Sequence, residues 1–66
     1  MDMINKLVDT PAGVGLCRII INGQAIVYYL DKPFFAYDVG DIKLCDMQDE
    51  MLYAQIEAKA IEELSK

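Results

Sequence analysis

The chain lacks histidine and tryptophan, has two cysteines and two prolines, and carries six basic residues against eleven acidic ones. Without histidine, neither Cys17 nor Cys45 can have an imidazole beside it as a general base, so the usual nucleophilic arrangements are missing. The two thiolates are also too few to make a structural zinc site by themselves. We therefore expect no catalytic residues, no metal, no cofactor and no enzymatic activity.

Long apolar runs and clusters of basic residues are absent as well. No stretch approaches the roughly 20 apolar residues of a membrane-spanning helix, and residues 1–6 lack the basic start and apolar stretch of a secretory signal. A net charge of −5 does not suit a phosphate backbone. We expect no membrane attachment and no direct binding to nucleic acid. The expected compartment is the cytoplasm (the host cytoplasm if the protein is viral), where both thiols stay reduced; a Cys17–Cys45 disulfide is the alternative.

Residues 1–66 are expected to form a single small domain. A domain of this size buries only about 60% of the surface that the unfolded chain exposes, so its core is marginal. Small domains often add disulfides, a metal or further copies to compensate. Because metal is not expected here, association with a partner is the expected source of further stability.

The stretch from Leu16 to Leu30 predicts a β-hairpin, because Asn22-Gly23 suits a type I′ turn with positive φ at both central residues. The turn sets Ile21 opposite Gln24, Ile19 opposite Ile26 and Cys17 opposite Tyr28. One face then carries Cys17, Ile19, Ile21, Gln24, Ile26, Tyr28 and Leu30, and the other carries Leu16, Arg18, Ile20, Ala25, Val27 and Tyr29. Both faces are largely apolar, so a single covering helix leaves one of them to be hidden by a partner.

The remaining segments complete a small α+β fold, an antiparallel sheet packed by one C-terminal helix. Residues 1–9 suit either a short helical turn or an edge strand, and Thr10–Gly15 reads as a loop. A third strand is expected over Phe34–Tyr37 and a short fourth strand over Ile42–Leu44, with a turn over residues 38–41 between them.

Asp46 is the predicted N-cap of a helix that runs from Met47 to about Ser65. At about 100° per residue, its apolar positions form two stripes rather than the single stripe of an ordinary surface helix. One stripe holds Leu52, Tyr53, Ile56, Ala60 and Leu64, and the other holds Met47, Met51, Ala54, Ala58 and Ile61. Polar residues that include Gln48 form the solvent edge. Two stripes indicate contact with two surfaces, the chain's own sheet and a partner.

The candidate interface therefore combines the second helix stripe with the uncovered face of the hairpin. From the hairpin it takes Arg18, Ile20, Val27 and Tyr29. Six of the eleven acids lie from Asp46 onward, and the acids expected to face a basic partner surface are Glu50, Glu57, Glu62 and Glu63. Alternatively, Arg18 pairs with Glu50 or Glu57 inside the chain, since an unpaired, partly buried charge is costly.

The favoured hypothesis is a small acidic interaction protein that acts by stoichiometric binding and inhibits a larger host or defence macromolecule. It is expected to form a homodimer or higher homo-oligomer. In size, charge and hairpin-plus-helix plan, the chain resembles the small acidic proteins that phages make against host or defence machinery, anti-CRISPR proteins among them. No motif carries this resemblance, so it assigns no residue a role.

Two other hypotheses stay open. One is a binder of a nucleotide-like small ligand, with a site formed between protomers by Tyr28, Tyr29, Phe35 and the Gly13–Gly15 loop. The other is a non-catalytic subunit of a larger assembly.

Overall fold

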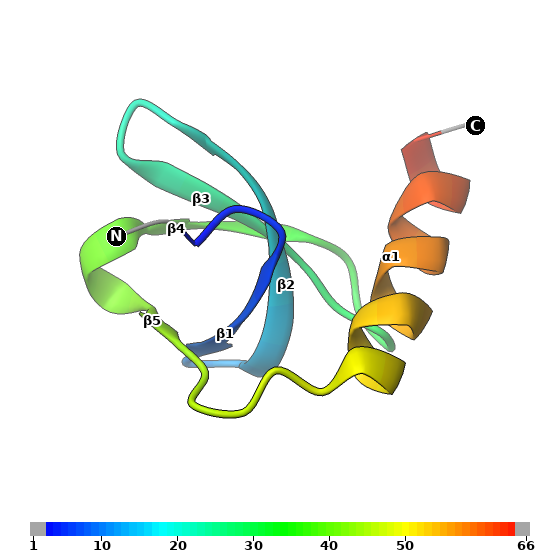
Figure 1. Cartoon of the computed structure of the whole chain (residues 1–66). Coiled ribbons are helices and arrows are strands. Elements are labelled where there is room, and N and C mark those ends of the chain that lie inside the picture. The colour runs from blue at the N-terminus through cyan, green and yellow to red at the C-terminus, as the bar shows by residue number, and fades with distance from the viewer. Residues whose placement is uncertain (1–2, 65–66) are drawn as a thin grey trace.

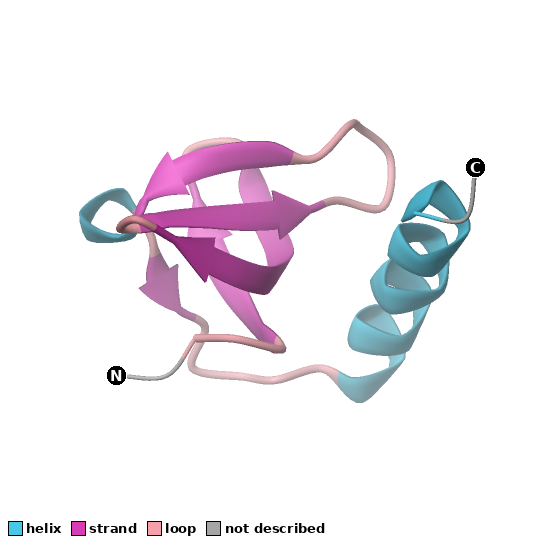
Figure 2. Ribbon diagram, turned by 90° about the horizontal axis from the view of Figure 1, so that it is seen from above, coloured by secondary structure: helices cyan, strands magenta, loops and turns pink. Residues whose placement is uncertain are grey.

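The computed structural model describes residues 3–64 and confirms the α+β fold, with an antiparallel sheet and one C-terminal helix (Figure 1). The elements are β1 (Lys6–Thr10), β2 (Gly13–Ile21), β3 (Gln24–Tyr28), β4 (Phe35–Asp38), the 3-10 helix η1 (Val39–Asp41), β5 (Lys43–Leu44) and α1 (Glu50–Leu64). The five strands form one sheet in the order β4-β3-β2-β1-β5. Figure 2 shows α1 lying along one side of this sheet.

The N-terminal segment contributes β1, which lies inside the sheet between β2 and β5 rather than at its edge. Residues 1 and 2 lie outside the described residues. The predicted loop over Thr10–Gly15 shrinks to a tight turn, because β2 begins at Gly13. Thr10 closes this turn: its hydroxyl accepts a hydrogen bond from the Ala12 N–H at 3.1 Å and donates one to the Gly13 carbonyl at 2.7 Å.

The Asn22-Gly23 turn is present as predicted, with φ of 52° at Asn22 and 77° at Gly23. Beside it, Ile21 pairs with Gln24 and Ile19 pairs with Ile26, as the turn requires.

The register then shifts at Arg18, which is an extra residue in β2. Cys17 pairs with Val27, and Leu16 pairs with Tyr28, so the predicted pairing of Cys17 with Tyr28 is wrong. Because side chains alternate along a strand, one extra residue exchanges the two faces of β2 on the far side of the bulge. The two predicted hairpin faces are therefore mixed in the structure.

Each face of the sheet packs a core of its own. The sheet curves away from α1 (Figure 1). The concave face, on the side away from α1, holds an inner core, whose buried residues are Met3, Val8, Cys17, Ala25, Val27, Tyr29 and Ile42. The other face meets α1 in an outer core, whose buried residues are Leu7, Leu16, Tyr28, Ile56 and Ala60. The curl of the sheet thus hides much of the apolar area that was expected to need a partner.

Helix α1 begins at Glu50 rather than at Met47, and its cap is Asp49 rather than Asp46. One carboxylate oxygen of Asp49 accepts hydrogen bonds from the N–H groups of Met51 at 3.0 Å and Leu52 at 3.2 Å. The predicted end at Ser65 lies outside the described residues.

Gln48 is exposed, as predicted, and its amide also joins the start of α1 to the sheet. Its side-chain oxygen accepts from the Leu7 N–H at 2.7 Å, and its side-chain nitrogen donates to the carbonyls of Leu7 and Cys45, both at 3.0 Å. The amide therefore inserts into the last rung between β1 and the chain that follows β5. This agrees with the later start of the helix, because the side chain of the residue before Asp49 is tied to the sheet.

Candidate functional site

The two predicted stripes of α1 lie on opposite sides of the helix. Ile56 and Ala60, at 0% and 1% exposure, pack into the outer core, with Leu52 and Tyr53 half-buried beside them. Leu64, assigned to the same stripe, is 66% exposed and does not join this core. The packed stripe is thus confirmed except at its last residue.

The opposite stripe is open to water. We call Met47, Met51, Ala54, Ala58 and Ile61 the exposed stripe; all five are exposed, with Met47 at 82%, Met51 at 74% and Ile61 at 51%. Met47 lies in the segment before α1, and the other four share one face of the helix by their spacing of three and four residues. An exposed apolar helix face of this kind often marks an interaction site.

The acidic residues of α1 divide into two groups. Glu50 and Glu62 are exposed and border the exposed stripe on its two sides at about 100° per residue. Glu57 turns toward the sheet, where its carboxylate lies 3.1 Å from the Arg18 guanidinium, and Glu63 is half-buried. The internal pairing of Arg18 that was considered as an alternative is therefore the arrangement found.

The Arg18–Glu57 pair joins the bulge of β2 to the middle of α1. The two side chains are 27% and 36% exposed, so solvent screens their attraction and the pair contributes little to stability. The pair is informative about geometry: the bulge places the Arg18 side chain on the helix side of the sheet, within reach of Glu57.

The other hairpin residues of the candidate interface face the inner core. Val27 is fully buried, Tyr29 is 3% exposed, and Ile20 is half-buried against the same core. The expectation that this face stays uncovered is wrong, because the curled sheet closes over it. These three side chains offer a partner little or no surface in the folded chain.

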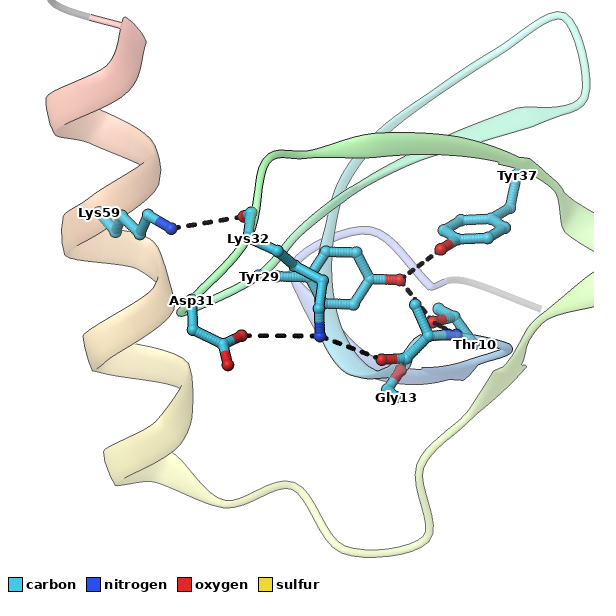
Figure 3. A network of polar contacts seen from close by, with 8 residues as sticks. Thr10, Gly13, Tyr29, Asp31, Lys32, Tyr37 and Lys59 are labelled. Carbon is cyan, nitrogen blue, oxygen red and sulfur yellow. Dashed lines mark hydrogen bonds and ion pairs between the residues drawn. The ribbon is translucent and has the colours of Figure 1, made fainter.

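Tyr29 organises a polar network at the end of the β1–β2 hairpin (Figure 3). Its hydroxyl bonds to the Thr10 hydroxyl and, at 2.7 Å, to the Tyr37 hydroxyl. The Lys32 ammonium lies 5.0 Å from the centre of the Tyr29 ring and donates to the Ala12 carbonyl at 3.3 Å. The network holds the β1–β2 hairpin, β4 and the β3–β4 loop together.

Burial raises the pKa of the Tyr29 hydroxyl from 10.0 to about 12, and the neighbouring Tyr37 adds to the rise while Thr10 opposes it. Folding therefore favours the protonated phenol. This contribution to stability is complete below pH 10.0 and is lost as the pH rises toward about 12.

We expect the urea midpoint of the wild type to fall more steeply across this window than that of a Tyr29→Phe variant. Parallel curves for the two proteins would contradict this assignment.

Two exposed aromatic residues lie at the start of β4, and neither was predicted to belong to the protein-binding surface; Phe35 was suggested only for the small-ligand alternative. Phe34 is 53% exposed and Phe35 is 59% exposed; the Phe35 ring lies 4.9 Å from Tyr37, and the Phe34 ring lies 5.2 Å from Tyr28. Their sequence signal, a Phe-Phe pair after Pro33, predicted a strand over Phe34–Tyr37, one residue earlier than β4 as found. It did not indicate that this strand lies at the edge of the sheet.

The residues suggested for a small-ligand site do not converge. Tyr28 belongs to the outer core and Tyr29 to the inner core, on opposite faces of the sheet. Gly15 is packed tightly against Val27 and the Tyr28 carbonyl. No pocket is found within residues 3–64.

Cys17 and Cys45 are not joined in a disulfide: Cys17 lies in the inner core and Cys45 packs against the outer core. Burial raises the pKa of the Cys45 thiol, and the nearby Asp9 adds to the rise, so this thiol is a poor nucleophile. Over residues 3–64 there is no group of three potential metal ligands. The one α-helix of that range is neither long nor apolar enough to cross a membrane.

Comparison with known proteins finds no matching family model, no matching curated protein and no matching solved structure, so the arrangement of side chains described above is the basis for a functional proposal.

Proposed function

We propose that the protein is a small acidic interaction protein that works by stoichiometric binding rather than by catalysis, and that it binds a larger protein target through the exposed stripe of α1. The observation that carries this proposal is the position of the stripe. It lies directly opposite the face of α1 that packs on the sheet, so it is not a by-product of the chain's own core.

The composition of the stripe supports a protein partner. Methionine at positions 47 and 51 is flexible and polarizable and adapts to irregular surfaces, whereas Ala54 and Ala58 allow a partner backbone to approach closely. A soluble monomer gains nothing from exposing this set, because each such side chain orders water unfavourably.

The charges beside the stripe indicate which charges surround the apolar patch of the partner. Glu50 and Glu62 border the stripe, Asp46 and Asp49 lie on either side of Met47 in the sequence, and the chain as a whole carries −5. An apolar patch rimmed by lysine or arginine complements this surface, and the opposite charges speed the encounter of the two proteins. Binding of this kind inhibits by covering the target's own site, in the cytoplasm where the target works.

The experiment compares two variants that differ only in where a charge is placed on α1. Met51→Lys puts a cation in the middle of the exposed stripe, and Gln55→Lys puts the same cation beside it. Each purified protein is used as bait, captured proteins are identified, and the candidate target is then purified and titrated against all three baits. We expect a 1:1 complex with the wild type and with Gln55→Lys, and at least a tenfold loss of affinity for Met51→Lys, which is about 1.4 kcal/mol.

Circular dichroism establishes that both variants are folded. Equal affinity of the two variants for the target excludes the stripe as the binding surface. Failure of the wild type to form a stoichiometric complex with any protein excludes the proposed function.

A further inference from the structure

The two edges of the sheet are protected to different degrees. At one edge, β5 is only two residues long, contains Lys43 and is followed at once by the chain that Gln48 ties to β1. At the other edge, β4 has four residues, pairs with β3 without any bulge and contains no lysine, arginine or proline. Natural sheets usually shield an edge by shortness, charge, proline or a bulge. The edge of β5 is thus shielded by its two-residue length and by Lys43, whereas the edge of β4 has only the single charge of Asp38 at its end.

The ladder between β3 and β4 shows which peptide groups face outward. The Val39 N–H donates to the Gly23 carbonyl at 3.0 Å, in line with the register that pairs Ala25 with Tyr37 and Val27 with Phe35. In an antiparallel pair, residues alternate between hydrogen-bonded and non-hydrogen-bonded positions. Val39, Tyr37 and Phe35 therefore direct their peptide groups toward β3. Ala36 and Asp38 direct theirs away from the sheet.

The side chains at this edge are also suited to a further strand. Phe35 is 59% exposed and Tyr37 is half-buried beside it on the same face, so a large part of the Phe35 ring is in water. Asp38 is the only charged residue of β4, in a chain whose net charge is −5. The edge is thus a nearly neutral, aromatic segment of an acidic molecule.

We propose that β4 pairs with β4 of a second copy, antiparallel and around a two-fold axis at Ala36, so that two sheets become one. This dimer seam goes beyond the proposed function and is independent of it, since it leaves the exposed stripe of α1 uncovered.

The proposed register satisfies every outward peptide group of β4. Ala36 faces Ala36 of the second copy in a hydrogen-bonded pair, and Asp38 faces Phe34 of the second copy in another. Phe35 then lies opposite Tyr37 of the second copy in a non-hydrogen-bonded pair, where side chains approach most closely and aromatic pairs stabilise best. The register keeps the two Asp38 carboxylates at opposite ends of the seam. A shift that brings them face to face puts like charges together.

Between two molecules, pairing of β4 with β4 suits this edge better than pairing of β4 with β5. Pairing β4 with β5 of another molecule joins four residues to two, sets Lys43 in the seam and leaves a free edge at each end, which propagates into open chains. Pairing β4 with itself is closed and uses the longer strand on both sides.

The test is a cysteine cross-link with a matched control, in a Cys45→Ser background. In the proposed register, the two Ala36 Cα atoms lie about 5.5 Å apart, within the range that a disulfide spans. The two Asp38 Cα atoms are about 13 Å apart along the strands, which is beyond it. We expect Ala36→Cys to give a covalent dimer on mild oxidation and Asp38→Cys to remain a monomer. No dimer from Ala36→Cys, or equal dimer from both variants, overturns the seam.

A second variant tests the outward N–H itself. Ala36→Pro removes a donor that points to solvent in the monomer, a position where an edge strand tolerates proline. We expect sedimentation to show a concentration-dependent dimer for the wild type and a folded monomer for Ala36→Pro. A wild type that stays monomeric at every concentration overturns the proposal. A wild type that stays monomeric and binds an extended peptide of another protein at the β4 edge overturns it as well.

The exposed stripe supplies the remaining comparison. Met51→Lys is expected to weaken target binding and to leave the Ala36→Cys cross-link unchanged. If Met51→Lys abolishes the cross-link, the stripe rather than β4 holds the dimer, and the seam is excluded. Target binding that fails while the cross-link forms excludes only the proposed function.

Discussion

Ile56→Ala is expected to lower the free energy of unfolding by about 3 kcal/mol, the largest loss from a single truncation in α1. Ile56 is 0% exposed and lies in the outer core with Leu7, Leu16 and Tyr28. Truncation loses the transfer free energy of the side chain and leaves a cavity beneath the helix. A chain of 66 residues has a total stability on the order of 3–10 kcal/mol, so this one change removes a large share of it.

Ile61→Ala is the matched control, since it removes the same atoms from the same helix at a position that is 51% exposed. Its effect on stability is expected to stay within about 0.5 kcal/mol. Urea denaturation followed by circular dichroism measures both variants. Equal losses for the two would show that α1 does not pack on the sheet through Ile56.

Gly15→Ala is expected to cost about 2–3 kcal/mol through overpacking. A Cβ atom at Gly15 would overlap Val27 Cγ1 and would lie 2.9 Å from the Tyr28 carbonyl oxygen and 3.0 Å from Tyr29 Cε1. Val27 is fully buried and Tyr29 is held by its hydroxyl, so neither side chain can retreat cheaply. The strand pairing of β2 with β3 must open to accept the methyl group.

Gly40→Ala provides the comparison, because a Cβ atom there meets nothing within 4 Å. Without a steric conflict, alanine restricts the unfolded chain and is expected to raise the free energy of unfolding by about 0.4–1 kcal/mol. Thermal or urea unfolding distinguishes the two glycines. A Gly15→Ala variant as stable as Gly40→Ala would mean that β2 and β3 are less closely packed at this point.

The sequence predicted the parts of the hairpin that the turn controls. The Asn22-Gly23 turn fixes the first pairs, up to Ile19 with Ile26, because a two-residue loop leaves no freedom of register. Beyond these pairs, the register depends on tertiary contacts: at the bulge, Arg18 reaches Glu57 on α1. No local spacing of apolar residues encodes such a contact, so the two faces of β2 were assigned incorrectly.

The helix shows a similar division. Its packed residues followed from the helical period, but two aspartates three positions apart are equal candidates for the cap, and the sheet chooses between them through Gln48. Leu64 has the right period and is still exposed, because it lies one turn beyond Ala60, the last residue of α1 buried in the outer core. Period gives the direction of a side chain, and only the neighbouring element decides whether anything lies there.

The candidate site was predictable to the same extent. The exposed stripe could be read from α1 alone, since it needs only the period and the knowledge that one side of a helix is packed. The edge position of β4 could not, because strand order depends on pairings that no local pattern specifies. Burial of Val27 and Tyr29 was missed for a related reason: the curl of the sheet creates a core that a flat hairpin lacks.

The contact between Gln48 and Leu7 spans 41 positions of sequence, and this separation has a consequence for biosynthesis. Chains leave the ribosome from the N-terminus at about 5–20 residues per second. Leu7, Leu16 and Tyr28 are therefore synthesised before Ile56 and Ala60, the helix residues that cover them in the outer core. For a few seconds of synthesis the nascent chain therefore lacks the helix residues that shield these three apolar side chains in the folded protein.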